Sequence, residues 1–206
     1  MLFGIEGTDR RMIYLAQYLQ NDGHTVTDCD SADIVILPPA FKTDKKYKRV
    51  LDNYTQNDFF KQKNAYPTAE GALCIALLNT DKVLRDCVCV ITGNGFVSKA
   101  LEELLLKIGV KTYVCARRNA DYGFSDIPSL NPDFIFNTVP AEVLCEDILK
   151  GVKDSVIIEL ASAPYGLDFE LASKLGLKVI KAGGLPGKMF PETAGKILFE
   201  TVSEVI

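Results

Sequence analysis

The chain has 206 residues, of which 48% are hydrophobic and 24% charged, and its formal net charge at pH 7 is −4. This composition is that of an ordinary globular protein with enough residues for one large core or two small ones. The negative charge argues against nucleic acid or an anionic membrane as the main partner. The chain has no apolar run of the roughly 18 residues that span a bilayer, and no signal peptide opens it. We therefore expect a cytoplasmic protein rather than an exported one.

The first forty residues predict a β-α-β unit followed by one more strand. The expected strands are 2–7, 24–29 and 32–39, and the amphipathic helix between the first two is 9–23. Residues 42–64 are polar and weakly periodic, which is typical of a solvated connection with at most a short helix or an edge strand.

Residues 66–84, "YPTAEGALCIALLNTDKVL", predict a proline turn followed by a helix that is apolar around most of its circumference. Such a helix usually lies between two layers, so we expect it to join two lobes. From Cys87 onward, strands and helices alternate, which predicts a mostly parallel sheet with helices on both faces. The strands are expected at 87–92, 111–116, 134–139, 155–161 and 178–184, and the helices at 97–108, 141–150 and 168–175. A last helix over 191–206 begins with proline and has apolar spacing suited to packing on the first lobe.

The cysteines are expected to be buried, reduced thiols rather than metal ligands. They lie at positions 29, 74, 87, 89, 115 and 145, with no CxxC pair among them. The single histidine, His24, is remote from them in sequence. We therefore expect no metal site and a reducing compartment.

The stretch "VITGNGFVSKALEELL" (90–105) places two glycines between a β-branched strand and a helix. Gly93 would allow a tight turn, and Gly95 would let a phosphate approach the backbone at the positive end of the helix. Ser98 stands at the third position of the dinucleotide pattern, where glycine or alanine is usual. The alternative is a tight connection in an α/β domain that binds no nucleotide.

The end of the next strand favours a dinucleotide that carries an extra phosphate. NAD-binding folds place an acidic residue about 20 residues after the first glycine. This chain has Ala116, Arg117 and Arg118 there. Two guanidinium groups suit the 2′-phosphate of NADP, which they can bind with charge-assisted hydrogen bonds. The alternative is a pair of solvated surface arginines.

Several stretches together resemble the family of the dipicolinate synthase A subunit. They are "YPTAEGALCIAL", "GNGFVSKAL", "CARR", "FIFNTVP" and "IELASAPYGLDFELASKLGLKVIKAGGLPGKMFPETAGKIL", with a looser match at "GTDRR". The resemblance covers roughly residues 65–206. It implies a formate-dehydrogenase-like pair of Rossmann-like lobes with substrate in the cleft between them. It also implies oxidation of dihydrodipicolinate to dipicolinate with NADP, the last step of dipicolinate formation in sporulation, and a second, flavoprotein-like subunit.

We therefore expect an α/β fold: a Rossmann-like parallel-sheet NADP-binding domain and a small, truncated flavodoxin-like N-terminal lobe. The expected domains are a first lobe over 1–66, an interlobe helix over 67–80, the NADP-binding domain over 81–190 and a returning helix over 191–206. We also expect a homo-oligomer, most simply a dimer.

Two departures from the family open an alternative function. The first lobe is shorter than the family's, and Ala163 stands where the family commonly has arginine after "LAS". A dicarboxylate needs cationic partners when it is buried. The alternative to an NADP-dependent oxidoreductase is therefore a non-catalytic NADP-binding subunit or sensor. D-2-hydroxyacid dehydrogenases use an acid–base histidine, and His24 lies in the wrong lobe for that chemistry.

The candidate site residues follow from the turn, the sheet edge and the resemblance. Thr138 would line the nicotinamide side, although Asn137 could instead cap a helix that starts there. Ser162 would bind a substrate carboxylate or the nicotinamide amide, and Arg11 would clamp a carboxylate unless it is an exposed helix arginine. The candidate catalytic residues are Ser162 and Thr138. The candidate cofactor-binding residues are Gly93, Asn94, Gly95, Phe96, Val97, Ala116, Arg117, Arg118, Thr138, Val139, Pro140, Leu160 and Ala161. The candidate substrate-binding residues are Arg11, Thr68, Glu70, Ser162, Lys188 and Thr193.

Overall fold

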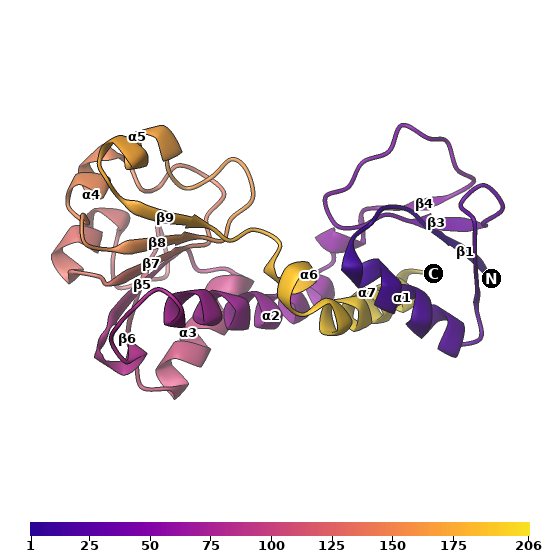
Figure 1. Ribbon diagram of the computed structural model, residues 1–206, viewed down its shortest axis with the longest axis horizontal. Helices are drawn as coiled ribbons and strands as arrows, with labels where there is room; N and C mark the ends of the chain where they lie inside the picture. The colour runs from indigo at the N-terminus through magenta and orange to yellow at the C-terminus, as the bar shows by residue number, and fades with distance from the viewer. The chain divides into compact units, whose positions relative to one another are not determined.

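The computed structural model describes residues 1–206 and divides them into two compact units (Figure 1). Unit 1 comprises Met1–Pro67 and Pro186–Ile206, and unit 2 comprises Thr68–Leu185. None of the helices combines the length and the apolar character needed to cross a membrane.

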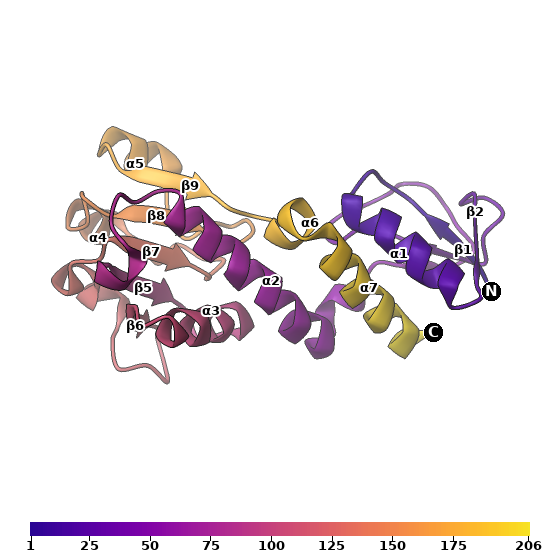
Figure 2. The ribbon, with the colours of Figure 1, turned by 60° about the horizontal axis from the view of Figure 1, so that its bottom comes forward.

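Unit 1 is built on a four-stranded parallel sheet with strand order β2-β1-β3-β4. Its strands are β1 (Leu2–Ile5), β2 (Thr25–Thr27), β3 (Ile34–Ile36) and β4 (Val50–Leu51). Its helices are α1 (Arg10–Asn21), a 3-10 turn (Tyr54–Gln56), α6 (Leu185–Met189) and α7 (Pro191–Val205). Helices α1 and α7 lie side by side in both ribbon views (Figures 1 and 2). Their apolar faces pack with Phe3 and Ile36 of the sheet to form the core of this unit.

The other face of the unit 1 sheet has no helix of its own. Val35 and Leu37 on this face are buried by Tyr47, Val50 and Cys29, which lie in or next to connecting segments. A thin cover of this kind buries less apolar surface than a helix does, and most of the stabilising core therefore lies on the α1/α7 side.

Unit 2 is a five-stranded parallel sheet with strand order β6-β5-β7-β8-β9. Its strands are β5 (Val88–Thr92), β6 (Lys111–Cys115), β7 (Phe134–Asn137), β8 (Val156–Glu159) and β9 (Lys178–Lys181). Its helices are α3 (Phe96–Lys107), α4 (Glu146–Lys150) and α5 (Phe169–Lys174), with 3-10 turns at Leu84–Asp86 and Phe124–Leu130. Helix α2 (Asp58–Leu77) begins in unit 1 and contributes Ala69, Ala72 and Ala76 to the core that it forms with α3. The opposite face of the sheet packs against α4 and α5. The predicted Rossmann-like α/β fold is confirmed.

Two predicted helices differ from the observed ones. Helix α2 begins at Asp58, so Pro67 lies inside it rather than at its start. Proline interrupts a helix by removing one N–H, and here the helix continues on both sides of that lost bond. The predicted helix over 141–150 is reduced to α4, because the backbone N–H groups of Val143 and Leu144 donate to the Gly166 carbonyl instead of forming helical hydrogen bonds.

Candidate functional site

The turn after β5 lies where the chain order of the unit 2 sheet reverses. From β5 the chain passes to β6 on one side and later returns to β7 on the other side. In open α/β sheets, ligands bind at such a point, beyond the carboxyl ends of the strands. Gly93 forms the turn with a φ of +92°, and its N–H donates to the Cys115 carbonyl at 2.8 Å. A Cβ at this position would lie 2.7 Å from Thr138 Oγ1, so the turn requires glycine for both its conformation and its space.

Gly95 differs from Gly93 because the space beside its Cα is open. It directly precedes α3 with an ordinary φ of −94°, and an added Cβ would meet no heavy atom within 4 Å. It supplies no side-chain cap to the helix, and the first turn of α3 has no acidic residue. The space beside Gly95 is therefore open, and neither a capping side chain nor a first-turn carboxylate competes for the N-terminal N–H groups of α3, which suits the binding of an anion.

Ser98 performs a structural role at the third position of the dinucleotide pattern. It is buried, and its Oγ donates to the Gly93 carbonyl at 2.7 Å. On the other side of the turn, Thr138 Oγ1 donates to the Thr92 carbonyl at 2.6 Å. These two hydroxyl groups hold the turn between β5 and α3 from both sides. The Thr138 hydroxyl is thus engaged with the main chain.

The loop after β6 carries the two arginines that are expected to bind a 2′-phosphate. Arg117 and Arg118 are exposed, and their side chains make no ion pair or hydrogen bond within the chain. The base of the loop is closed by the Ala116 N–H, which donates to the Tyr122 carbonyl at 3.0 Å. Its tip is tied to the turn at Gly93–Gly95, since Asn94 Nδ2 donates to the Asn119 carbonyl at 2.7 Å. The loop is shaped by main-chain contacts, while its guanidinium groups remain available.

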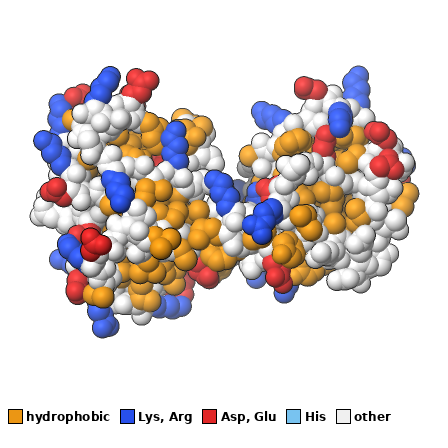
Figure 3. All heavy atoms as spheres, in the orientation of Figure 1, with side chains coloured by type: hydrophobic (Ala, Val, Ile, Leu, Met, Phe, Trp, Pro, Cys, Tyr) orange, Lys and Arg blue, Asp and Glu red, His pale blue; other side chains and the backbone are white.

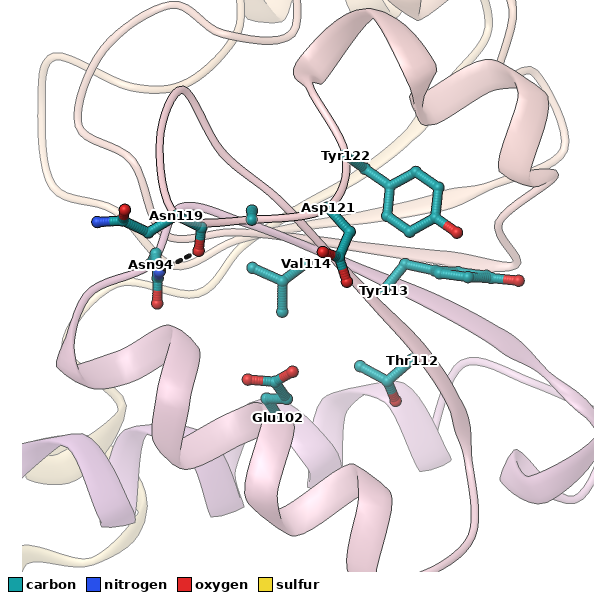
Figure 4. Close-up of a pocket in the computed structure, with 9 residues that line it drawn as sticks. Asn94, Glu102, Thr112, Tyr113, Val114, Asn119, Asp121 and Tyr122 are labelled. Carbon is teal, nitrogen blue, oxygen red and sulfur yellow. Dashed lines mark hydrogen bonds between the residues drawn. The ribbon is translucent and has the colours of Figure 1, made fainter.

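A pocket of about 580 Å³ lies between this loop, β6 and α3 (Figure 4). The hydrogen bond between Asn94 and Asn119 lies at one end of it, and the carboxylates of Glu102 and Asp121 point into it. On the face drawn in Figure 3, acidic and basic side chains are interspersed over both units. The formal net charge of the chain is −4, so positive potential for an anion would have to come from locally placed groups such as the arginines of this loop.

A buried row of polar side chains crosses the carboxyl end of the unit 2 sheet. Thr92, Asn137, Glu159 and Lys181 are in-register partners on β5, β7, β8 and β9. Thr92 Oγ1 donates to Asn137 Oδ1 at 2.5 Å, and Asn137 Nδ2 donates to Glu159 Oε1 at 2.7 Å. Asn137 does not cap a helix, because no helix starts there, and that alternative is wrong. The Lys181 ammonium lies outside the buried part of the row, 3.8 Å from the centroid of the Phe169 ring.

Glu159 connects this row to the loop that carries Ser162. Its oxygens accept hydrogen bonds from the N–H groups of Ala161 at 3.0 Å and Gly166 at 3.1 Å. Burial raises the pKa of the Glu159 carboxyl above its ordinary value, although the hydrogen bonds from Asn137, Gly166 and Ala161 act in the opposite direction. The carboxylate thus fixes both ends of a loop at the edge where ligands of this fold class bind. Ser162 itself is exposed in this loop.

Comparison with known proteins gives one curated relative and several solved structures, while no family model matches the chain. The A subunit of dipicolinate synthase from Bacillus subtilis (strain 168) is 30% identical over 173 residues, which cover 77% of this chain and 58% of that protein. This chain is similar to the dipicolinate synthase A subunit. The predicted resemblance is confirmed, and the match spans 58% of the length of that relative.

The solved structures agree on the fold. The A subunit of dipicolinate synthase from Bacillus halodurans superimposes with a TM-score of 0.85 at 21% identity, covering 99% of this chain and 97% of that chain. The apo form of D-lactate dehydrogenase from Escherichia coli gives a TM-score of 0.61 at 12% identity, covering 99% of this chain and 95% of that chain. The two-lobe architecture is therefore shared with proteins named as dehydrogenases, as well as with the synthase subunit.

The candidate substrate residues are divided between the two units. Arg11, Lys188 and Thr193 belong to unit 1, whereas Thr68, Glu70 and Ser162 belong to unit 2. Of these, Glu70, Ser162, Lys188 and Thr193 are exposed and Thr68 is buried.

Arg11 is neither an exposed helix arginine nor an uncompensated cation. It is only 8% exposed, and its Nε and a terminal nitrogen bind the two carboxylate oxygens of Asp9 at 3.0 and 2.7 Å. Burial raises the pKa of Asp9, but the hydrogen bonds and charge of Arg11 outweigh it and hold that pKa below its ordinary value. A Cβ added to Gly187 would lie 2.7 Å from Arg11 Nε, so the guanidinium also packs against α6.

Sequence reasoning placed Asn94 among the cofactor-binding residues but missed its hydrogen bond to the next loop, and it missed Asn137 and Glu159 as contributors to the shape of the site. A signal for the other two is present, because the apolar strands "FIF" and "VII" each end in a polar residue that a parallel register aligns. Polar residues at the carboxyl ends of neighbouring parallel strands meet at one edge of the sheet.

Proposed function

We propose that this chain is an NADP-dependent dehydrogenase that oxidises a dihydrodipicolinate-like ring dicarboxylate to dipicolinate. The similarity to the A subunit of dipicolinate synthase supports the substrate class. The observation that carries the cofactor assignment is the turn at Gly93–Gly95, which combines an open approach to the start of α3 with an adjacent pair of unpaired arginines.

The residues of this turn fit a dinucleotide. Gly95 and the first N–H groups of α3 would bind the diphosphate, and Arg117 and Arg118 would bind the 2′-phosphate. The remaining cofactor contacts would come from the segments after β7 and β8, residues 138–140 and 160–161. Both segments are held by the hydrogen bonds of Asn137 and Glu159.

The chemistry requires little acid–base assistance from the protein. Oxidation removes a hydride and a proton from the ring, and NADP, when bound, accepts the hydride. Aromatisation of the ring drives the reaction, so the proton can pass to solvent without a histidine base. The chain's own contribution is to orient the ring and to exclude competing geometries. Ser162 would hydrogen-bond a ring carboxylate or the nicotinamide amide, and Thr138 would hold the turn beneath the nicotinamide.

Asp121, in the same loop as the two arginines, would favour NAD instead of NADP. Its carboxylate points into the pocket beside β6, and a carboxylate near this strand end is the usual partner of the NAD ribose. Titration of the protein with NADP and NAD by calorimetry separates the two. Tighter binding of NADP supports the assignment to the arginines, and tighter binding of NAD contradicts it.

The dehydrogenase activity is tested with freshly prepared dihydrodipicolinate. Absorbance should report NADPH when the chain is supplied with NADP, either alone or together with a flavoprotein-like second subunit, the partner that the resemblance implies. The same assay without NADP serves as the control. Lack of NADPH formation under both conditions contradicts the enzyme proposal.

A non-catalytic NADP-binding subunit or sensor is the second candidate function. Two observations favour it: Ala163 provides no cation after β8, and Arg11 is already neutralised by Asp9. A dicarboxylate would need cationic partners from elsewhere in the chain. Tight NADP binding without turnover of the ring dicarboxylate would support this second function.

A further inference from the structure

The loop that carries Arg117 and Arg118 is held to the turn at Gly93–Gly95 by the side chain of Asn94, which lies 25 positions before its partner in the sequence. Asn94 Nδ2 donates to the Asn119 carbonyl at 2.7 Å, and Figure 4 shows this bond at the end of the pocket. Asn119 has a φ of +55°, a left-handed conformation that asparagine tolerates better than most residues. Arg117 and Arg118 directly precede it. The position of both arginines is therefore linked to the turn through one hydrogen bond at the tip.

The rest of the loop is fastened only at its base and along the pocket wall. The Ala116 N–H bonds the Tyr122 carbonyl, and Cys115 pairs with Tyr122 as an isolated bridge. Between these base contacts and the tip, the loop borders the pocket into which Glu102 and Asp121 point. Two carboxylates would repel a phosphate placed between them. A phosphate bound by this loop must therefore lie on the side of the arginines, and the loop must keep them turned toward the ligand.

We propose that Asn94 is a specificity-determining residue that favours NADP over NAD, because its bond to the Asn119 carbonyl preorganises the loop of Arg117 and Arg118. This inference rests on the proposed use of NADP and deepens it. A loop ordered before binding loses less conformational entropy when the ligand binds. That advantage applies to the 2′-phosphate, which contacts the loop, and not to the diphosphate, which contacts the turn. Asn94 acts through the arginines and is a positioning residue.

The test compares NADP and NAD affinities of four variants by calorimetry, with thermal melting as the check on folding. Asn94→Ala should weaken NADP binding about three- to tenfold, the range expected for loss of one hydrogen bond, and change the NAD affinity far less. In an Arg117→Ala/Arg118→Ala background, the same substitution should affect both nucleotides equally, since the groups through which it acts are gone. The matched control is Asn79→Ala, which removes a side-chain hydrogen bond of similar length, to the Ile75 carbonyl at 2.8 Å, outside this loop and should leave the NADP:NAD ratio unchanged.

The outcomes separate this inference from the proposed function. If the native chain binds NADP more tightly than NAD and Asn94→Ala keeps the same ratio, Asn94 has no specificity role, although the cofactor assignment stands. An effect of Asn94→Ala on NADP that persists without the two arginines also overturns the inference. If the native chain binds neither nucleotide, or binds NAD more tightly, the cofactor assignment fails and the inference fails with it.

Discussion

Replacing Asn137 with aspartate tests the buried polar row at the carboxyl end of β7 and β8. In the native chain Asn137 Nδ2 is 2.7 Å from Glu159 Oε1 and 3.0 Å from the Val139 carbonyl oxygen. The substitution keeps the size of the side chain but places an oxygen where the only donor between these two acceptors had been. Asn137 is 0% exposed and Glu159 is 1% exposed, so water cannot replace the lost donor.

The expected loss of stability is large for a change of one atom. A hydrogen bond to a charged group contributes about 1.5–3 kcal/mol. A buried charge left without its partner raises the total to about 3–5 kcal/mol, and we expect Asn137→Asp to lower the free energy of unfolding by this amount near neutral pH. Urea denaturation followed by far-ultraviolet circular dichroism measures the difference from the native chain.

The pH dependence of that difference identifies its cause. Two adjacent buried carboxyl groups bind a shared proton more tightly in the folded state than in the unfolded one, so the folded pKa is raised. The destabilisation is therefore complete above the folded pKa and decreases as pH falls toward the unfolded value of about 4. A double variant, Asn137→Asp/Glu159→Gln, restores a donor between the oxygens and should recover part of the loss. Equal destabilisation at neutral pH and at about pH 5, or no recovery in the double variant, would refute the reasoning.

Three further predictions concern the turn at Gly93–Gly95, the start of α1 and the cysteines. Gly93→Ala should lower the free energy of unfolding by about 2 kcal/mol or more, because the new Cβ would lie 2.7 Å from a hydroxyl at a φ of +92°. Gly95→Ala should change the free energy of unfolding by less than about 0.5 kcal/mol, because the space there is open, and yet weaken nucleotide binding in a calorimetric titration. Asp9→Asn keeps the cap of α1 but loses the ion pair with Arg11. Because the pKa of Asp9 in the folded chain lies below 3.8, the ion pair stabilises the fold by about 1–2 kcal/mol above that pH. Denaturation at a series of pH values should show the difference between the variant and the native chain vanishing as pH falls through the folded pKa. Cys145 is exposed, while burial raises the pKa of Cys115 to about 12. Labelling of the native protein with iodoacetamide, followed by peptide mass spectrometry, should therefore find Cys145 modified before Cys115. Equal labelling of the two thiols would contradict the structure.

The features that sequence predicted best are those set by the backbone. Alternating apolar strands and helices predicted the parallel sheet of unit 2, and the glycine pair predicted the sharp turn after β5. Both follow from local rules, because a strand-to-helix turn with a φ of +92° requires glycine whatever lies around it. The turn at Gly93–Gly95 could therefore be located without knowing which other segments approach it.

Sequence was less informative where a local signal competed with a distant partner. Pro67 is a strong break signal, yet α2 continues through it, because Phe60 before it and Ala69 after it are each packed into a buried core. The segment after "NTVP" has helical spacing, but its N–H groups bond the Gly166 carbonyl, and this acceptor lies more than twenty residues away. A pattern of residue types in one sequence cannot indicate a hydrogen-bond partner that lies so far along the chain.

The same distinction separates the expected cofactor-binding residues from the expected substrate-binding residues. A diphosphate is bound mainly by main-chain N–H groups, whose positions follow from a turn and a helix. A dicarboxylate must be bound by side-chain cations, and whether a cation is available depends on its neighbours in the fold. Arg11 matched the expected residue type, but Asp9 already satisfies its charge, so binding a carboxylate there would require Arg11 to exchange one anionic partner for another. We therefore expect Asp9→Asn, which frees Arg11 without removing it, to bind dipicolinate more tightly than the native chain in a calorimetric titration; equal affinity would show that Arg11 does not bind a carboxylate of this ligand.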